Sequence, residues 1–148
     1  MIKILYIIFL SLIVANCSFK KVIKHHGVPF LEKKQKQLSI NQSNKNDIIK
    51  ILGAPSTKSI LEDDLWIYIE NRKSKSSLFK LGKEIVITNN VLVLEINNKG
   101  ILKNKKFYNI NDINKIDFNK DQTAMSDKDS FVYSVISSLR QKIDSSKK

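Results

Sequence analysis

The sequence has 148 residues, with 26 lysine and arginine residues against 14 aspartate and glutamate residues, and a formal net charge of +12. A chain of this length can hold one domain with a modest core. Its charge has two open explanations: a basic surface that meets anionic phospholipid headgroups, or lysine-rich usage without functional meaning. The export signal described next argues against nucleic acid as the partner.

The chain begins as a secretory signal peptide does. Lys3 precedes a mostly apolar run over residues 4–15, and no other charge occurs before Lys20. As a helix this run would be about 18 Å long, too short for a hydrocarbon core of roughly 30 Å. We therefore expect residues 1–16 to be removed as a signal peptide, which leaves a mature chain with a net charge of +11.

Cys17 follows the signal peptide directly. The preceding Val14-Ala15-Asn16 resembles a bacterial lipobox, although Gly, Ala or Ser is usual where Asn16 stands. Cys17 is the only cysteine, so it can form no internal disulfide, and acylation would remove a free thiol from an oxidising compartment. We expect Cys17 to carry a covalent lipid. By resemblance to sorted lipoproteins, the non-acidic Ser18 indicates the outer membrane.

Residues 17–37 are basic and lack apolar periodicity, which predicts a tether between lipid and domain, with a short helix from Pro29. The tether contains His25 and His26. Neighbouring histidines point in different directions on a strand or helix, and a metal site would need further ligands. We therefore expect no metal, and no cofactor other than the lipid.

A short helix is predicted over residues 44–52. Asn44 can cap its N-terminus, with Asp47 completing a variant of the capping box. Apolar residues at helical spacing follow, Gly53 suits the left-handed position after the last turn, and Pro55 prevents continuation.

Strands are predicted next. Residues 65–69 alternate, with Trp66 and Tyr68 on one face. Residues 71–83 are polar and basic and indicate an exposed loop. Residues 84–96 are best interpreted as one or two strands, in which Asn89-Asn90 forms a bulge, a hairpin turn or two exposed positions. After a turn at 97–100, residues 101–110 form the last predicted strand.

An amphipathic helix is predicted over residues 127–143. Ser126 and Asp129 form a second capping box, and apolar residues from Phe131 to Ile143 share one face. This stripe would be a sizeable exposed patch in water, so we expect it to pack on the sheet. The alternative is a docking helix that stays mobile until a partner's groove accepts it.

These elements predict an α+β fold with short N-terminal helices, a three-stranded antiparallel meander and an amphipathic C-terminal helix. The expected organisation is a lipoprotein signal peptide at 1–16, a lipidated basic tether at 17–37, a domain at 38–143 and a disordered tail at 144–148.

Two segments carry a resemblance to a known family. Residues 47–56 end a helix with Leu52-Gly53-Ala54-Pro55, and the strand Trp66-Ile67-Tyr68 follows about ten residues later. This pattern resembles the BamE family (also called SmpA/OmlA), small lipoproteins of the outer membrane assembly machinery. Residues 91–96 and 100–102 resemble its last two strands, and His26-Gly27 looks like a feature of its alphaproteobacterial branch. The resemblance covers roughly residues 25–110.

The resemblance implies a non-catalytic lipoprotein that faces the periplasm from the outer membrane and stabilises or modulates the complex inserting β-barrel proteins. The implied partners are the barrel subunit BamA and BamD-like lipoproteins, together with anionic phospholipid. Where the family commonly has a glycine before the helix, this chain has Asn41, which tolerates positive φ better than most residues. Candidate partner-binding residues are Asn41, Trp66, Tyr68 and Phe131, although a Trp or Tyr on a short strand more often packs in a core, which we favour.

The sequence leaves one alternative function open and argues against another. A related adaptor or inhibitor lipoprotein could use the same fold for another protein target, because fold does not fix function. An enzyme is not expected, because nucleophilic catalysis needs a positioned base beside Ser or Cys, and the histidines are in the tether. Asp63 and Asp64 are adjacent, which puts them on opposite strand faces rather than across a cleft.

Overall fold

The structure is a computed structural model that describes residues 3–4, 22–60, 64–75, 84–116 and 126–145. Along the chain lie β1 (Ile23–Gly27), α2 (Leu31–Gln35), α3 (Lys45–Leu52), β2 (Thr57–Ile60), β3 (Asp64–Lys75), β4 (Glu84–Ile96), β5 (Leu102–Tyr108), α4 (Ile110–Lys115) and α5 (Asp127–Ser145). The α+β class predicted from the sequence is confirmed. The signal peptide beyond residues 3–4, and Cys17, lie outside the described residues.

The strands form one antiparallel sheet in the order β1-β3-β4-β5, with β2 also paired to β3. Strand β3 pairs with β4 along its whole length, so β1 and β2 share its other edge. There β2 pairs with the first half of β3, from Asp64 to Ile67, and β1 with the second half, from Glu70 to Ser74. The predicted meander corresponds to β3, β4 and β5, and two edge strands were missed.

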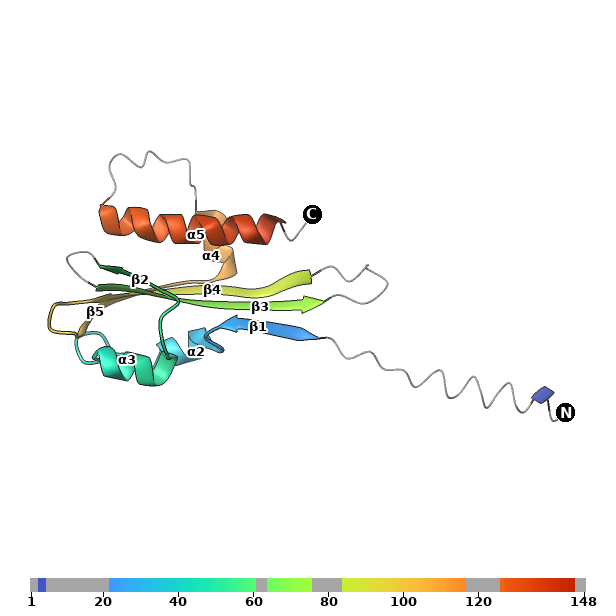
Figure 1. Ribbon diagram of the computed structural model, residues 1–148, viewed down its shortest axis with the longest axis horizontal. Helices are drawn as coiled ribbons and strands as arrows, with labels where there is room; N and C mark the ends of the chain where they lie inside the picture. Colours follow the sequence, from blue (N-terminus) through green and yellow to red (C-terminus); the bar gives the residue numbers. More distant parts are fainter. Residues whose placement is uncertain (1–2, 5–21, 61–63, 76–83, 117–125, 146–148) are drawn as a thin grey trace.

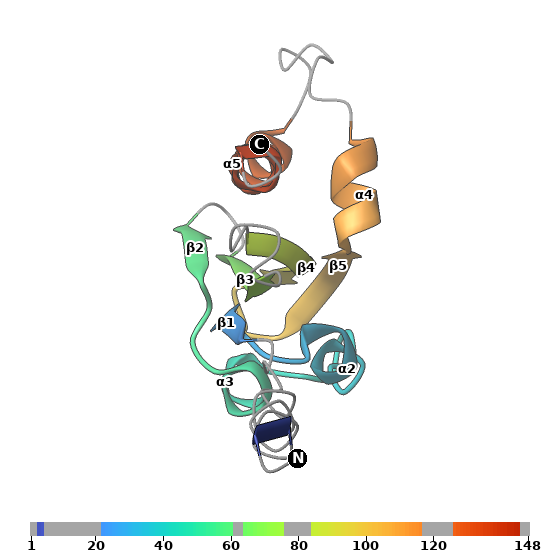
Figure 2. The same ribbon diagram turned by 90° about the vertical axis from the view of Figure 1, so that its right-hand side faces the viewer.

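Two helices cover one face of this sheet. Figure 2 shows α2 and α3 on one side and α4 and α5 on the other. On the α2–α3 side, buried residues of the sheet pack against Leu31, Ile48 and Leu52 of the helices. Because side chains alternate along a strand, Trp66, Tyr68, Leu92 and Leu94 all point to this side.

The C-terminal helix covers the opposite face. Val132, Ile136 and Ile143 of α5 are buried against Leu65, Ile67, Val91 and Val93 of the sheet. Figure 1 shows α5 lying along the sheet on the side away from α3. Of the two alternatives for this helix, the structure shows the packed one, in which the stripe of apolar residues is shielded from water. The helix includes Asp144 and Ser145, so the prediction of a disordered tail is wrong for these two residues.

Helix α3 begins and ends much as its sequence predicts. The Asn44 side chain accepts hydrogen bonds from the backbone of Asn46 and Asp47, and the Asp47 carboxylate accepts one from Asn44 N–H. Gly53 has φ 83°, as expected, but its ψ of −163° is extended rather than left-handed helical. This combination is essentially restricted to glycine, so the chain leaves α3 abruptly toward β2.

Three predictions about irregular segments were wrong. Residues 23–27, assigned to the tether, form β1 because they pair with the far half of β3. The short helix expected from Pro29 is present as α2. Residues 71–75, assigned to a loop, continue β3. Residue 110, predicted to end the last strand, instead begins α4, which Asn109 caps with Asp112 as Asn44 caps α3 with Asp47.

The pair Asn89-Asn90 was also misassigned. Both residues are buried inside the single continuous strand β4. Asn89 Oδ1 accepts a hydrogen bond from Asn71 at 3.3 Å, and Asn90 Nδ2 donates to Glu70 at 3.0 Å. Each buried asparagine thus has a partner on β3, but within the described residues Asn89 Nδ2 and Asn71 Oδ1 make no hydrogen bond.

Candidate functional site

The aromatic residues of β3 belong to the core. Trp66 and Tyr68 are buried on the α2–α3 side of the sheet, so neither offers its ring to a partner. The Lys58 ammonium lies 4.6 Å from the centroid of the Trp66 ring, and that of Lys45 lies at 6.0 Å. Both ammonium groups lie over the Trp66 ring at distances that allow cation–π interactions. The core interpretation of both aromatics therefore fits their positions.

Tyr68 has a specific structural role. Its hydroxyl donates a 3.0 Å hydrogen bond to the carbonyl of Gly53, at the end of α3. Burial raises the pKa of Tyr68 to about 12, because the phenolate would lose its hydration. The hydroxyl therefore stays protonated, as a donor to this carbonyl requires, throughout the neutral range.

Asn41 occupies the strained position that was expected of it. Its φ is 64°, in the region that glycine and asparagine tolerate best. Its backbone N–H donates to the carbonyl of Leu102 at 2.8 Å, and the carbonyl of Ser43 accepts from Leu102 N–H at 2.9 Å. The loop is thus fixed to the start of β5, while the side chains of Ile40 and Asn41 remain exposed.

Phe30 is a second residue with strained backbone, and the sequence analysis missed it. It precedes α2 with φ 58° and ψ 39°, which is uncommon for a bulky residue, and its side chain is 58% exposed. The buried carboxylate of Glu70 holds this conformation, accepting hydrogen bonds from Phe30 N–H at 2.9 Å and Leu31 N–H at 3.2 Å. No local sequence pattern reveals such a site, because Glu70 lies 40 residues away.

Phe131 lies on the other side of the sheet. It is half-buried on α5 and packs against the core between α5 and the sheet. The structure therefore does not bring the four predicted partner-binding residues into one site. Asn41 is exposed on the α2–α3 side, Trp66 and Tyr68 are buried beneath that side, and Phe131 belongs to the opposite layer.

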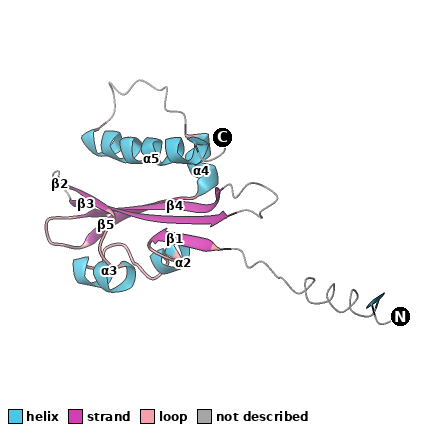
Figure 3. Ribbon diagram, turned by 45° about the vertical axis from the view of Figure 1, so that its right-hand side comes forward, coloured by secondary structure: helices cyan, strands magenta, loops and turns pink. Residues whose placement is uncertain are grey.

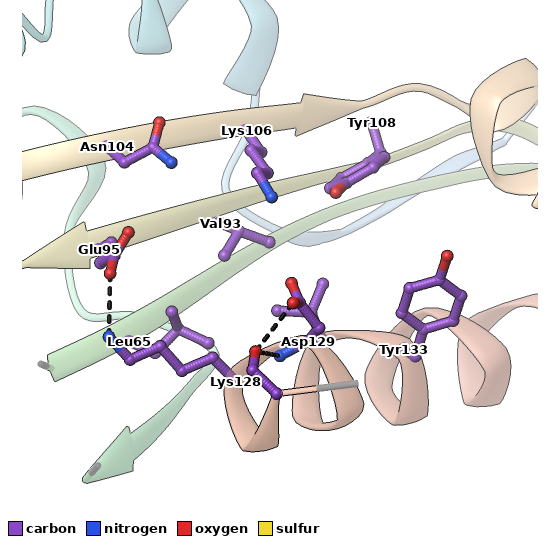
Figure 4. Close-up of a pocket in the computed structure, with 11 residues that line it drawn as sticks. Leu65, Val93, Glu95, Asn104, Lys106, Tyr108, Lys128, Asp129 and Tyr133 are labelled. Carbon is purple, nitrogen blue, oxygen red and sulfur yellow. Dashed lines mark hydrogen bonds and ion pairs between the residues drawn. The ribbon is translucent and has the colours of Figure 1, made fainter. Parts of the chain in front are cut away.

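A cavity of about 480 Å³ lies between the sheet and the start of α5. Figure 4 shows Lys106 and Tyr108 of β5 on one side and Asp129 and Tyr133 of α5 on the other. Burial raises the pKa of Tyr108, with a smaller contribution from the neighbouring Tyr133 and Asp129. Its described lining combines apolar and polar side chains: Leu65, Val93, Glu95, Asn104, Lys106, Tyr108, Ser126, Lys128, Asp129, Val132 and Tyr133.

Four of the polar residues around this cavity make contacts that stabilise the fold. Lys128 Nζ lies 3.0 Å from Glu95 Oε1, which ties α5 to β4. Ser126 Oγ donates to Asp129 Oδ2 at 2.8 Å and accepts from Asp129 N–H, which caps α5. The Ser126 hydroxyl and the Asp129 carboxylate are therefore both engaged in the capping box of α5.

The two histidines are separated by the sheet. On β1, His25 lies opposite Arg72 and His26 opposite Asn71, so their side chains point to opposite faces. Across the described ranges, no group of three His, Cys, Asp or Glu residues is placed to hold a metal ion. Within the same ranges, no helix has the length and apolar character needed to cross a membrane.

Comparison with known proteins gives one match. The family model of the outer membrane protein assembly factor BamE domain matches residues 30–106, from the start of α2 into β5. Neither the curated proteins nor the solved structures include a significant match. The matched region takes in the helical layer of α2 and α3 and the strands β2 to β5 that this layer covers. This chain therefore belongs to the BamE family of outer membrane protein assembly factors.

Proposed function

We propose that this protein is a non-catalytic lipoprotein subunit of the outer membrane β-barrel assembly complex, where it stabilises or modulates the insertion of outer membrane proteins. The observation that carries the proposal is the BamE match over residues 30–106, which spans the α2–α3 layer and most of its sheet. The signal sequence supports it, because a lipid on Cys17 would anchor the domain to the periplasmic side of the outer membrane. We assign it no cofactor beyond that lipid.

We place its partner contact on the loops that flank α2. Phe30 and Ile40 are large apolar residues that remain exposed, and Phe30 and Asn41 both adopt a strained backbone. Strain at an exposed position costs free energy without improving the core, which is typical of binding surfaces. BamA and BamD-like subunits are the proposed partners for this surface, and anionic phospholipid is the proposed lipid.

The test is a detergent pull-down of the tagged full-length protein from its own cells, with mass spectrometry of the bound proteins. We expect BamA and a BamD-like lipoprotein to co-purify with the wild-type chain. Phe30→Ser and Ile40→Asp should each lower that recovery at least severalfold. Asn114→Asp is the matched control, since it adds a charge to an exposed position of α4, on the other side of the sheet.

Two results would count against the proposal. If a different protein is recovered in place of BamA and BamD, the chain is an adaptor or inhibitor on the same fold. If Phe30→Ser and Ile40→Asp recover both subunits as well as Asn114→Asp does, the contact surface lies elsewhere. Circular dichroism on each purified variant separates lost contact from lost folding.

A further inference from the structure

The two ends of α5 cover different parts of the sheet. Figure 3 shows this helix lying lengthwise along the sheet. Near the start of the helix, Val132 is buried in one apolar cluster with Leu65 and Val93. Lys128 Nζ also lies 3.0 Å from Glu95 Oε1, so this half of α5 is held by apolar packing and by an ion pair.

Polar residues of the sheet lie toward the other end of the helix. His26 of β1 lies opposite Asn71 of β3, and Asn71 lies opposite Asn89 of β4, so the three side chains line up across adjacent strands. Because side chains alternate along β3, Asn71 shares the face of Ile67 and Ile69, which α5 covers. We call His26, Asn71 and Asn89 the polar row.

A cavity of about 370 Å³ lies between this end of α5 and the sheet. Leu139, Lys142 and Ile143 of the helix line one side of it, and His26, Asn71 and Lys73 of the sheet line the other. Side chains that face a cavity make fewer dispersion contacts than side chains in a close-packed core. The last turns of α5 are therefore less tightly packed on the sheet than a helix that fills this space would be.

The polar row contains buried polar atoms without partners. Asn71 Nδ2 donates to Asn89 Oδ1 at 3.3 Å, whereas Asn71 Oδ1 and Asn89 Nδ2 are buried without a hydrogen bond among the described residues. Exchanging the oxygen and nitrogen of both amides would reverse the bond and again leave one donor and one acceptor unpaired. A buried polar group without a partner costs free energy that hydration would restore. The closed position of α5 therefore shields polar atoms that an open position would hydrate.

A serine marks the point at which α5 can bend. Ser138 Oγ donates to the carbonyl of Ser134 at 2.9 Å, and side-chain bonds of this kind slightly destabilise a helix and often bend it. Beyond this point Ile143 is buried, and Arg140 Nη1 donates to the carbonyl of Ile116 at 2.8 Å. These contacts close the last turns of α5 over the cavity.

We propose that residues 139–145 of α5 form a lid that opens over the polar row while the first half of the helix stays packed on the sheet. An open lid lets water reach the unpaired amide atoms and exposes a mainly polar floor. Removal of the whole helix would also expose Leu65 and Val93, which the hydrophobic effect opposes. The sheet can therefore uncover its polar row and keep the core beneath α5 intact. This motion is a property of the fold and does not depend on which partner the domain binds.

Hydrogen exchange of the full-length chain in detergent measures the opening of the lid. A variant that combines Asn71→Leu with Asn89→Leu removes every polar atom of the amide pair and keeps side chains of similar size. With no buried polar atom left to hydrate, the closed lid gains stability, so exchange at residues 139–145 should slow severalfold. Asn104→Leu is the matched control, because this asparagine of β5 lines the cavity beneath the start of the helix. It should leave exchange at residues 139–145 unchanged.

The variants are needed because chain ends fray in most domains, so fast exchange at the end of α5 is not sufficient evidence of a lid. Unchanged or faster exchange at residues 139–145 in the double variant would overturn the proposal. Equal slowing in Asn104→Leu would also overturn it, because the effect would then not come from the polar row. Melting midpoints of both variants, compared with the wild type, show whether each one folds.

A second variant, Ile143→Ala, decides the question if the double variant fails to fold. This change removes a buried apolar contact of the lid and leaves Val132 packed at the other end of the helix. We expect exchange at residues 139–145 to accelerate severalfold, while residues 129–136 exchange as they do in the wild type. Equal acceleration over both ranges would show that α5 leaves the sheet as one unit, and the lid would be rejected.

Discussion

The hydroxyl of Tyr68 donates a 3.0 Å hydrogen bond to the carbonyl of Gly53, and so joins the middle of the central strand to the end of α3. The hydroxyl is the only group of this buried side chain that needs a hydrogen-bond partner. The hydrogen bond and the abrupt exit of the chain at Gly53 therefore hold the helical layer in register with the sheet.

Tyr68→Phe should lower the free energy of unfolding by about 0.5–1.5 kcal/mol near neutral pH, the usual net value of one hydrogen bond. The pKa of Tyr68 is raised by burial from 10.0 to about 12. Its protonated form is favoured by the fold, so this stability is fully present below pH 10 and is lost as the pH rises toward 12. Urea unfolding from pH 8 to pH 11.5 should show a smaller alkaline loss in Tyr68→Phe than in the wild type. Parallel pH profiles would show that Tyr68 ionises normally.

Two glycines should differ sharply when each is changed to alanine. Gly27 and Gly53 both have positive φ, so alanine is strained at either position. At Gly53 an added Cβ meets nothing within 4 Å, which limits the cost to backbone strain of about 1–3 kcal/mol. At Gly27 the added Cβ would lie 1.9 Å from the carbonyl oxygen of Ile69, so β1 must separate from β3. Thermal melting should therefore place Gly27→Ala well below Gly53→Ala; the reverse order would mean that β1 is not paired as described.

The buried carboxylate of Glu70 should be essential to α2. It accepts hydrogen bonds from the N–H groups of Phe30 and Leu31 and from Asn90 Nδ2. Glu70→Gln replaces one acceptor oxygen with a donor that faces other donors, and should cost about 1–3 kcal/mol. Hydrogen exchange should show faster exchange at residues 30–35 while the α5 side is unchanged. Uniform acceleration over the whole domain would instead indicate general destabilisation.

Lipidation is tested by Cys17→Ser. The apolar run that ends at this residue predicts that the variant stays unprocessed or appears soluble in the periplasm, with no radiolabelled palmitate. Serine is close to cysteine in size but has no thiol to acylate. Palmitate incorporation equal to that of the wild type would show that the lipid is attached elsewhere or that labelling is non-specific.

Local signals and long-range pairing explain which elements the sequence predicts. The two residues of the α3 capping box, Asn44 and Asp47, are three residues apart, so the sequence alone predicts this helix start. The same pattern, Asn109 with Asp112, caps α4, and the sequence analysis missed it. Strand β1 has no apolar alternation, and all five of its residues are exposed, so it forms only because β3 offers an edge. Phe30 and Asn90 depend in the same way on Glu70, which lies 40 and 20 residues away.

The last prediction concerns α5. Ile136 is buried where this helix crosses the sheet, among the residues that pack against Ile67, Val91 and Val93. Ile136→Ala should lower the free energy of unfolding by about 2–5 kcal/mol, the range found for buried isoleucine truncation. Gln141→Ala is the matched control, because this residue is exposed on the same helix and alanine preserves helix propensity.

Removal of the helix gives the sharper test of its role. A chain ending at Gln122 would expose the face formed by Leu65, Ile67, Val91 and Val93, so we expect a lower melting midpoint and aggregation during purification. Arg140 Nη1, which donates to the carbonyl of Ile116 at 2.8 Å, also links α5 to the end of α4. If the shortened chain instead melts like the wild type and recovers less of its partners in the pull-down, α5 acts as a docking helix that rests on the sheet between encounters. Those two outcomes are exclusive, because a helix that contributes its apolar stripe to the core cannot be removed without exposing the sheet beneath it.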